Sequence, residues 1–292
     1  MDQPRSRTIH VALNFNDRYW ALAYTVMRSI CLTTTRRRDL VFHLCHGPLS
    51  ADHAAFLDRI GTEFPVRLCH HDPETDAEFG RILDQLPTTE RFPRIVYGRL
   101  LLDRLLPREV ERVLYLDCDV MVRRPIEELY DLDLEGMAIG AVADPYHDGI
   151  KLGRDIRTKQ SPFDSAQPYF NSGVLLIDRA AFAAADLPGR IAEFARTGLL
   201  SQLYFDQDIL NLVFAGNWLE LPWRFNLLEP RKPHESLGPV ILHYTGHRRP
   251  WWPYSGVAFS RTYRHVMTNE VFYRQLRERI RGRLGSLIGR RP

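Results

Sequence analysis

Two carboxylates follow an apolar run in the middle of the chain, at Asp117 and Asp119 of the segment LDCDV. The preceding run, Val113–Leu116, is typical of a buried strand. Side chains two residues apart in an extended chain point the same way, so both carboxylates can face one ligand. Adjacent carboxylates repel each other unless a cation or a proton lies between them. The pair predicts a site for a hard divalent cation, Mg²⁺ or Mn²⁺, with a turn carrying two solvated carboxylates as the alternative.

A third candidate ligand, His243, ends another apolar run, Val240–His243. Imidazole suits Mn²⁺ better than Mg²⁺, although a histidine at the end of a strand is more often a hydrogen-bonded core residue. The residues that follow favour a ligand. Gly246 lets the backbone approach a bound group closely, and the guanidinium of Arg249 fits phosphate oxygens.

Short apolar runs alternate with amphipathic segments along the chain. Strands are predicted at Ile9–Leu13, Leu40–Cys45, Val66–Cys69, Val113–Leu116, Met137–Ala143, Gly173–Ile177 and Val240–His243. Helices are predicted near residues 20–32, 50–60, 94–106, 180–197 and 207–214. This alternation predicts an α/β fold with a mainly parallel sheet, which binds its ligands at the carboxyl ends of the strands. The chain has no GxGxxG and no P-loop sequence, which argues against a Rossmann dehydrogenase and a P-loop kinase.

Four stretches, in this order, resemble glycosyltransferase family 8, the retaining enzymes that include bacterial lipopolysaccharide α-galactosyl- and α-glucosyltransferases. They are the opening strand as far as Tyr19, RVLYLDCDVMV, YFNSGVLLID with FDQDILN, and HYTGHRRPW. The resemblance runs from about residue 8 to residue 252. It implies a nucleotide-diphospho-sugar transferase fold of the GT-A type in a single domain, a UDP-sugar donor and a divalent cation, usually Mn²⁺.

The resemblance also implies a donor site. Asp117, Asp119 and His243 would hold Mn²⁺, or Mg²⁺ in its place, against the diphosphate of UDP, where the metal offsets the charge of the leaving group. Gly246 and Arg249 match the diphosphate-binding loop, in which the family commonly has Lys where this chain has Arg249. The other donor contacts that the resemblance implies are Asn14, Asn16, Tyr19, Arg99, Cys118 and Asn171.

The loop after the first strand departs from the family pattern. Family members often read Asp-Asp-Asn-Tyr where this chain reads Asn16-Asp17-Arg18-Tyr19. Tyr19 can still stack on a pyrimidine, but Asn16 lacks the negative charge and Arg18 replaces a small amide with a long cation. The expectation of a UDP donor therefore rests on the resemblance. Without the resemblance, Tyr19 is interpreted as a loop-packing residue and Arg99 as a solvated arginine on a helix.

Four residues match positions around the transferred sugar: Asp144, Asn171, Asp206 and Gln207. Taken alone, Asp144 and Asn171 are natural turn residues and Asp206 is a natural helix N-cap. Retaining glycosidases use a carboxylate nucleophile, whereas the matched position here is Gln207, a poor nucleophile. We therefore favour front-face transfer, in which Gln207 stabilises the oxocarbenium-like carbon and Asp206 orients the sugar. A covalent intermediate on Asp206 is the alternative.

Charge is distributed unevenly along the 292 residues. The formal net charge is +3, but residues 261–292 hold nine Arg and two Glu, a balance of +7, which leaves about −4 on the rest of the chain. In this tail Phe272, Leu276, Ile280 and Leu284 recur at four-residue steps, which predicts a helix with an apolar stripe beside a cationic face. Such a helix can dock on an anionic membrane surface, or pack its stripe on the body.

These features suggest a catalytic domain at residues 8–252, with a nucleotide-binding half (8–120) and an acceptor and sugar half (121–252), followed by the basic tail (253–292). The four cysteines show no paired spacing, which favours a reducing compartment. The N-terminus has no apolar signal core, so we expect a cytoplasmic protein whose tail can bring it to the inner face of the membrane. An acidic body argues against nucleic-acid binding.

Two other functions stay open. LDCDVMV also resembles the first motif of haloacid-dehalogenase-type phosphatases, although that motif usually opens its domain and here follows 116 residues. A non-catalytic nucleotide-sugar or carbohydrate-binding protein would bind metal and donor without turnover. The choice between galactose, glucose and a rarer sugar is also open, as is the acceptor, which the loops around residues 70–95 and 150–168 are expected to read.

Overall fold

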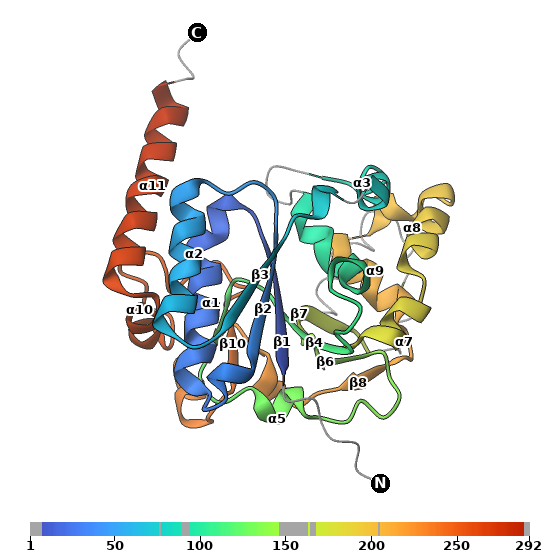
Figure 1. Ribbon diagram of the computed structural model, residues 1–292, viewed down its shortest axis with the longest axis horizontal. Coiled ribbons are helices and arrows are strands. Elements are labelled where there is room, and N and C mark those ends of the chain that lie inside the picture. Colours follow the sequence, from blue (N-terminus) through green and yellow to red (C-terminus); the bar gives the residue numbers. More distant parts are fainter. Residues whose placement is uncertain are drawn as a thin grey trace.

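The computed structural model describes residues 8–75, 77–88, 94–145, 163, 168–203 and 205–288, with side chains given for all of these except 78, 79 and 283–288. Most of the expected acceptor loop around 150–168, and residues 76 and 89–93 of the other, lie outside the described residues. A seven-stranded sheet in the order β3-β2-β1-β4-β7-β6-β8 forms the centre of the molecule (Figure 1). Its strands are β1 (Ile9–Phe15), β2 (Leu40–His46), β3 (Arg67–His71), β4 (Arg112–Leu116), β6 (Ile139–Ala143), β7 (Phe170–Asp178) and β8 (Trp218–Glu220).

The sheet is mostly parallel, as predicted. β1 pairs in parallel with β2 and β4, β2 with β3, and β6 with β8. The exception is β7, which runs antiparallel to both β4 and β6. The polar residues that follow β1 and β4 therefore meet at one edge of the sheet, where ligands of such folds bind.

A second, three-stranded sheet carries His243. It consists of β5 (Val120–Val122), β10 (Ile241–His243) and β9 (Leu227–Leu228), in the order β5-β10-β9. The predicted strand at Val240–His243 thus exists, but it pairs with β5 and not with the main sheet. β5 was not predicted because its three residues follow the Asp pair directly and look like a continuation of the β4 segment.

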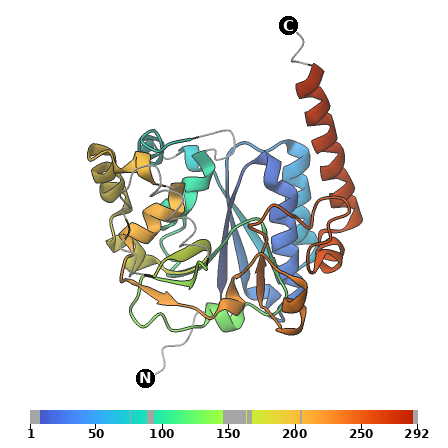
Figure 2. The same cartoon turned by 180° about the vertical axis from the view of Figure 1, so that it is seen from behind.

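Helices cover both faces of the main sheet (Figures 1 and 2). On one face lie α1 (Trp20–Thr33), α2 (Ala51–Glu63), α10 (Ser260–Met267) and α11 (Asn269–Ile288). On the other lie α3 (Ala77–Leu83), α4 (Leu102–Leu105), α7 (Arg179–Ala184), α8 (Leu187–Arg196) and α9 (Phe205–Val213). A short helix, α5 (Glu127–Tyr130), follows β5.

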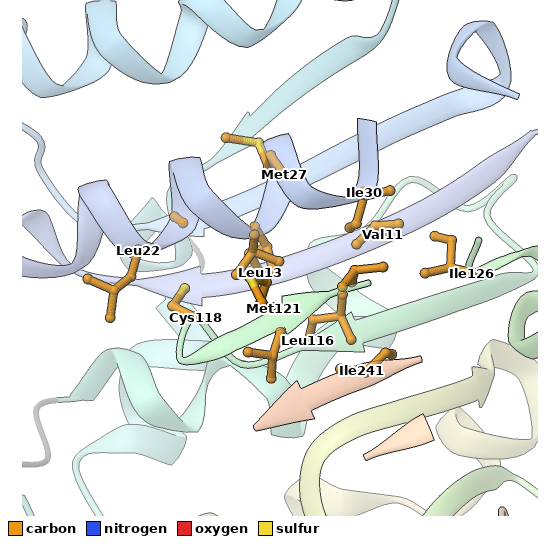
Figure 3. Packing of buried hydrophobic residues seen from close by; sticks show 14 of the residues in the cluster. Val11, Leu13, Leu22, Met27, Ile30, Leu116, Cys118, Met121, Ile126 and Ile241 are labelled. Atoms are coloured by element: carbon orange, nitrogen blue, oxygen red, sulfur yellow. The ribbon is translucent and has the colours of Figure 1, made fainter. Parts of the chain in front are cut away.

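Alternation along β1 divides the core between these two faces. Val11 and Leu13 belong to one buried cluster with α1, β5 and β10, and Ala12 belongs to the other. Figure 3 shows the first cluster, in which Met27 and Ile30 of α1 lie beside β1. A strand buried on both faces reads as a nearly continuous apolar run, which is why its sequence predicted it well.

Two predicted helices are interrupted. The segment expected at 180–197 forms α7 and α8, because Asp186 adopts a left-handed backbone (φ 46°) and caps α8 ahead of Pro188. The segment expected at 94–106 is mainly a 3-10 helix, Arg94–Leu101, which continues as α4. Arg99, on this 3-10 helix, lies in the interior, with 8% of its surface exposed.

The first part of the predicted tail is packed into the body. Tyr263, Met267 and Phe272 are buried members of the same core cluster as β1. Glu278 accepts hydrogen bonds from the indole Nε1 of Trp20 (3.1 Å) and from Arg274 Nε (3.1 Å), and it lies 3.1 Å from His53 Nε2. The tail is therefore not a separate element over this stretch.

Beyond Glu278, residues Arg279, Arg281 and Gly282 still line a hollow together with Tyr19 of the body. The end of α11 extends past α2 in both views (Figures 1 and 2). Of the predicted apolar stripe, Phe272 is buried and Leu276 packs partly against the core, whereas Ile280 is 49% exposed. The side chain of Leu284 lies outside the described residues. No helix among the described residues is both long enough and apolar enough to cross a membrane.

Three histidines form a row across adjacent strands: His10 on β1, His43 on β2 and His71 on β3. His10 Nδ1 lies 2.9 Å from His43 Nε2, and His43 Nδ1 lies 3.0 Å from His71 Nε2. Burial, together with the neighbouring imidazoles, lowers the pKa of His43 to about 3. Burial is also the main cause that lowers the pKa values of His10 and His71. The row is therefore built from neutral rings.

Candidate active site

The three predicted metal ligands converge at the edge of the main sheet. Asp117 follows β4, Asp119 precedes β5, and His243 ends β10, which pairs with β5. One ligand atom from each of the three residues lies within 4.8 Å of the other two. The second sheet therefore positions His243 against the carboxylate pair, a contact between residues more than 120 positions apart in sequence.

Each carboxylate keeps one oxygen turned toward His243. Asp117 Oδ1 accepts hydrogen bonds from the Tyr115 hydroxyl (2.8 Å) and pairs with Arg99 Nη2 (2.8 Å), while its Oδ2 lies 3.8 Å from His243 Nε2. Asp119 Oδ2 accepts from Arg249 Nη1 at 3.0 Å, and its Oδ1 lies 3.1 Å from His243 Nε2. Two carboxylate oxygens and one imidazole nitrogen are thus gathered at a single point.

This donor set fits a divalent cation such as Mn²⁺. Carboxylate oxygens and imidazole nitrogen are ligands that Mn²⁺ accepts. Burial would raise the pKa of Asp119, but His243 and Arg249 outweigh it and lower that pKa to about 2. Asp119 is therefore ionised at neutral pH, as a ligand must be.

A bulge in β7 makes room for the cluster. The pairing of β7 with β6 shifts between Ala141, which faces Leu175, and Val142, which faces Asn171. Within the bulge lies Gly173, where a Cβ atom would come within 2.2 Å of His243 Cε1 and 2.8 Å of Asp117 Oδ2. Only glycine lets the strand pass this close to two ligands, which explains its position in the NSG segment.

Arg99 connects the metal cluster with the residues predicted around the sugar. Its Nη2 pairs with Asp117, and its Nε lies 2.6 Å from Asp206 Oδ2, as an ion pair that lacks hydrogen-bond geometry. Its Nη1 donates to the carbonyl oxygen of Ser172 at 2.9 Å. Burial opposes the charge of Arg99, but Asp117 and Asp206 outweigh it and raise the Arg99 pKa. Arg99 is thus a buried bridge and not a solvated helix residue.

Asp206 does not act as the helix cap that its sequence context allowed. α9 begins at Phe205, and the carboxylate of Asp206, which is 7% exposed, faces Arg99. Burial raises the pKa of Asp206, whereas Arg99 opposes the rise. The next residue, Gln207, points into the same site from the first turn of α9.

The Gln207 amide is held by a network of polar groups. Its Oε1 accepts hydrogen bonds from the backbone N–H of Ser172 (3.1 Å) and from Asn171 Nδ2 (3.2 Å). Its Nε2 donates to Asp144 Oδ2 (3.3 Å) and to the Tyr169 hydroxyl (3.2 Å). Asn171 Nδ2 also donates to Asp144 Oδ2 (3.3 Å). The structure therefore places Asp144, Asn171 and Gln207 in one hydrogen-bond network, to which Ser172 of the bulged strand also belongs.

The loop after β1 borders a large open hollow. A 3-10 helix, Asp17–Tyr19, follows β1, and Asn16 caps it by accepting from the backbone N–H of Arg18 at 3.0 Å. Tyr19 is 46% exposed and lines a hollow of about 1070 Å³ together with Asp119 and Arg249. Tyr19 is thus available for stacking beside the metal cluster, whereas the side chain of Asn16 already has a structural partner.

Three further predicted donor residues have distinct surroundings. Both polar atoms of the Asn14 amide are buried without a hydrogen-bond partner among the described residues, and a Cβ on Gly98 would lie 2.6 Å from Asn14 Nδ2. The side chain of Cys118 lies in the core (Figure 3), where its Sγ is 3.6 Å from the carbonyl oxygen of Asn14. Gly246 lies against Glu229 and lines a different hollow from the one that Arg249 lines.

Sequence reasoning missed several residues that support the site, namely Tyr115, Tyr169, Ser172, Gly173, Asp208 and Asn226. Asn226 precedes β9, and its Oδ1 lies 3.0 Å from His243 Nδ1. Asp208 is fully buried and accepts from the Tyr169 hydroxyl at 2.5 Å. A polar residue inside an apolar stretch, as Asn226 is in RFNLL, was the available signal.

Comparisons with known proteins agree with this geometry. The family model described as glycosyl transferase family 8 matches residues 10–253. General stress protein A of Bacillus subtilis is 22% identical over 282 residues, which are 90% of this chain and 94% of that protein. Lipopolysaccharide 1,2-glucosyltransferase of Escherichia coli K12 is 29% identical over 199 residues, covering 64% of this chain and 58% of the enzyme.

The probable glycosyl transferase Gly of Streptococcus gordonii is a longer protein that is 32% identical over 153 residues. These residues are 50% of this chain and 20% of Gly. Among solved structures, galactosyltransferase LgtC in complex with donor and acceptor sugar analogs superposes with a TM-score of 0.71 at 22% identity, covering 89% of this chain and 95% of LgtC. The bifunctional glycosyltransferase WbbM gives 0.71 at 18% identity, covering 94% of this chain and 53% of WbbM.

These likenesses identify the fold as that of the GT-A glycosyltransferases. The haloacid-dehalogenase interpretation of LDCDVMV is therefore wrong, because the segment lies inside the matched family region. The prediction of a glycosyltransferase is confirmed, and the chain belongs to glycosyl transferase family 8.

Proposed function

We propose that this glycosyltransferase is a metal-dependent, retaining hexosyltransferase that moves galactose or glucose from a UDP-sugar to a glycan or lipopolysaccharide-type acceptor. The observation that carries the proposal is the convergence of Asp117, Asp119 and His243 next to Arg249 and Tyr19. The lipopolysaccharide glucosyltransferases among the relatives support the acceptor class.

The donor would lie across these groups. Asp117, Asp119 and His243 would hold Mn²⁺, or Mg²⁺, which when bound offsets the charge that develops on the departing diphosphate. Arg249 would bind a phosphate oxygen, and Tyr19 would stack on the base. Because Asn16 caps its own 3-10 helix, the base would be read by other groups, for which the unpartnered amide of Asn14 is the best candidate.

Front-face transfer fits the partners of the catalytic candidates. Gln207 Oε1 already accepts hydrogen bonds and Asp206 is paired with Arg99, so neither is poised as a nucleophile. In this mechanism the bond from the anomeric carbon to the diphosphate oxygen breaks as the acceptor oxygen bonds to that carbon on the same face. The proton of the acceptor hydroxyl passes to the departing oxygen. Gln207 would stabilise the cationic carbon, and Asp144 and Asp206 would orient the sugar.

A donor assay tests this function. UDP-glucose and UDP-galactose are supplied with and without Mn²⁺, and release of UDP and the anomeric configuration of the product are followed by NMR. We expect turnover that EDTA abolishes, that Asp119→Asn lowers at least about 100-fold, and that retains the anomeric configuration. Turnover that is insensitive to EDTA and to this substitution contradicts the proposal. Binding of Mn²⁺ and UDP-sugar without turnover, with acceptor glycans present, indicates the non-catalytic alternative.

We also propose that the end of α11 docks on an anionic membrane. Arg277, Ile280 and Arg281 are exposed on α11, and Arg281 also lines the hollow that Tyr19 borders. Each Arg near anionic headgroups contributes about 1 kcal/mol, and salt screens this attraction. Co-sedimentation with anionic vesicles should fall with added salt and in the variant Arg277→Glu/Ile280→Ser. No sedimentation of the native chain at either salt concentration rejects docking.

A further inference from the structure

The metal ligand His243 has a second hydrogen-bonding partner on its other ring nitrogen. Nε2 faces the carboxylates of Asp117 and Asp119, while Nδ1 lies 3.0 Å from Oδ1 of Asn226. Both residues are buried, His243 at 2% exposure and Asn226 at 1%. With water excluded, each ring nitrogen must match its own partner as a donor or an acceptor of a hydrogen bond.

The orientation of the Asn226 amide is fixed by a chain of hydrogen bonds that starts at the backbone. The N–H of Gly173 donates to Asn171 Oδ1 at 3.0 Å, and a backbone N–H can only donate. This identifies the oxygen end of the Asn171 amide. Asn226 Nδ2 donates to the same oxygen at 2.9 Å, so the other end of the Asn226 amide, facing His243, must be its carbonyl oxygen.

A carbonyl oxygen can only accept, so Nδ1 of His243 must carry a proton. Nε2 lies 3.1 Å from Asp119 Oδ1, an ionised carboxylate oxygen that can only accept, so a metal bound at this point would displace a proton from Nε2 and leave the ring its Nδ1–H. We propose that Asn226 is a positioning residue that holds His243 in the Nδ1–H tautomer and so presents Nε2 as a metal ligand. The metal role of His243 rests on the proposed function.

The same chain of amides reaches the residues around the sugar. Asn171 Nδ2 donates to Gln207 Oε1 at 3.2 Å and to Asp144 Oδ2 at 3.3 Å. Asn171 and Asn226 therefore form a continuous link from the metal ligand to Gln207. A substitution that breaks this link at Asn226 leaves Asn171 bonded to Gly173, Gln207 and Asp144, so its primary effect falls on His243.

The proton on Nδ1 can be observed without metal or donor. Long-range ¹H–¹⁵N correlation spectra of the metal-free native chain show which nitrogens of each histidine ring carry a proton. His243→Gln assigns the signals by their loss. We expect a protonated Nδ1 in the native chain, whether or not Nε2 also shares a proton with Asp119, and an unprotonated Nδ1 in Asn226→Leu, where the proton of the ring lies on Nε2. An unprotonated Nδ1 in the native chain overturns the proposal, as does an unchanged, protonated Nδ1 in Asn226→Leu.

Metal affinity provides the second readout, measured as free Mn²⁺ by electron paramagnetic resonance. Loss of a partner behind a ligating histidine typically weakens metal binding 10- to 100-fold, so we expect a loss of about that size in Asn226→Leu. Asn226→Asp keeps an oxygen acceptor for Nδ1–H but replaces the Nδ2 donor to Asn171 Oδ1 with a second acceptor, so it should lose affinity, although less than Asn226→Leu. Mn²⁺ binding as tight in Asn226→Leu as in the native chain overturns the proposal.

Asn211→Leu is the matched control. The Asn211 amide is also buried, at 6% exposure, but it bonds to the backbone of Phe170 and Gln207 and does not touch His243. We expect unchanged Mn²⁺ affinity in this variant, and an equal loss in both leucine variants would show a general structural effect that overturns the proposal. The two failures can be told apart, because native chain that neither binds Mn²⁺ nor turns over donor contradicts the proposed function whatever the tautomer.

Discussion

At the scale of single residues, Arg99 holds the site together. It is a buried cation whose guanidinium meets Asp117, Asp206 and the carbonyl oxygen of Ser172, and it lies 4.7 Å above the ring of Tyr115. The carboxylate of Asp206 is buried and that of Asp117 is partly buried, so the net stabilisation depends on the partners staying together. Arg99, which connects the candidate metal ligand Asp117 with the proposed sugar site, is therefore also a structural residue.

Removing the charge of Arg99 should destabilise the fold. Arg99→Met leaves Asp206 buried without its counterion, which costs about 3–5 kcal/mol in free energy of unfolding. Urea denaturation measures this loss. Arg94→Met is the control, because Arg94 pairs with the exposed carboxylate of Asp84 and should lose less than about 1 kcal/mol. A loss below about 1 kcal/mol for Arg99→Met would contradict this account of the buried cluster.

A second residue-scale prediction concerns Gly173. In Gly173→Ala the new methyl would overlap His243 Cε1 and Asp117 Oδ2, so the ligands must separate. We expect at least a 10-fold loss of Mn²⁺ affinity, measured by calorimetry, in a chain whose circular dichroism is native. In the control Gly47→Ala, the added Cβ meets no atom within 4 Å. Native affinity in Gly173→Ala would show that the ligand cluster is not confined in this way.

At the scale of elements, the strands were predicted where their residues are buried on both faces, as in β1, β2 and β4. The ligands that follow these strands were predicted for the same reason. The sequence could not predict that β10 joins a second sheet through β5, because a pairing of three-residue strands depends on tertiary contacts. The sequence also could not predict the role of supporting amides such as Asn226, because that role depends on contacts with residues distant in sequence.

The helix α11, which forms much of the tail, is linked through His53 to the loop that carries Tyr19. His53 lies between Asp17, at the start of the loop that carries Tyr19, and Glu278 of α11. Arg274 also pairs with Asp52 at the start of α2. Residues of α11 from Arg274 to Gly282 therefore form part of the wall of the hollow.

Two truncations separate the buried part of the tail from its end. A chain that ends at residue 259 loses the buried side chains of Tyr263, Met267 and Phe272, and each such loss costs about 2–5 kcal/mol, so we expect it not to fold. A chain that ends at Gly282 keeps all of these contacts and should melt within about 3 °C of the full chain. Circular dichroism melting curves measure both. A folded chain that ends at residue 259 would contradict the integration of the tail into the core.

At the scale of the whole molecule, the histidine row sets an acid limit on stability. The folded-state pKa values of His10, His43 and His71 lie below the ordinary value near 6.5, so the unfolded chain binds protons that the folded chain does not. Their contribution is fully present above pH 6.5 and is lost progressively as the pH falls toward the folded values. At about pH 5 the loss from His43 alone is about 2 kcal/mol.

The prediction is a fall in the free energy of unfolding between about pH 6.5 and pH 4, measured by urea denaturation at a series of pH values. His43→Phe should flatten this dependence, even if it lowers stability at neutral pH. His265→Phe, at an exposed position on α10, should leave the dependence unchanged. An equally steep acid dependence in His43→Phe would assign the effect to other groups.

The antiparallel strand β7 has a consequence for how the donor is received. β7 belongs to the half of the chain that holds Asn171, yet it hydrogen-bonds along five residue pairs to β4, the last strand of the proposed nucleotide-binding half. A hinge between the halves would have to break this ladder, so the two move as one rigid body. The floor of the site is therefore preformed, and closure over a bound donor must be confined to segments outside the sheet.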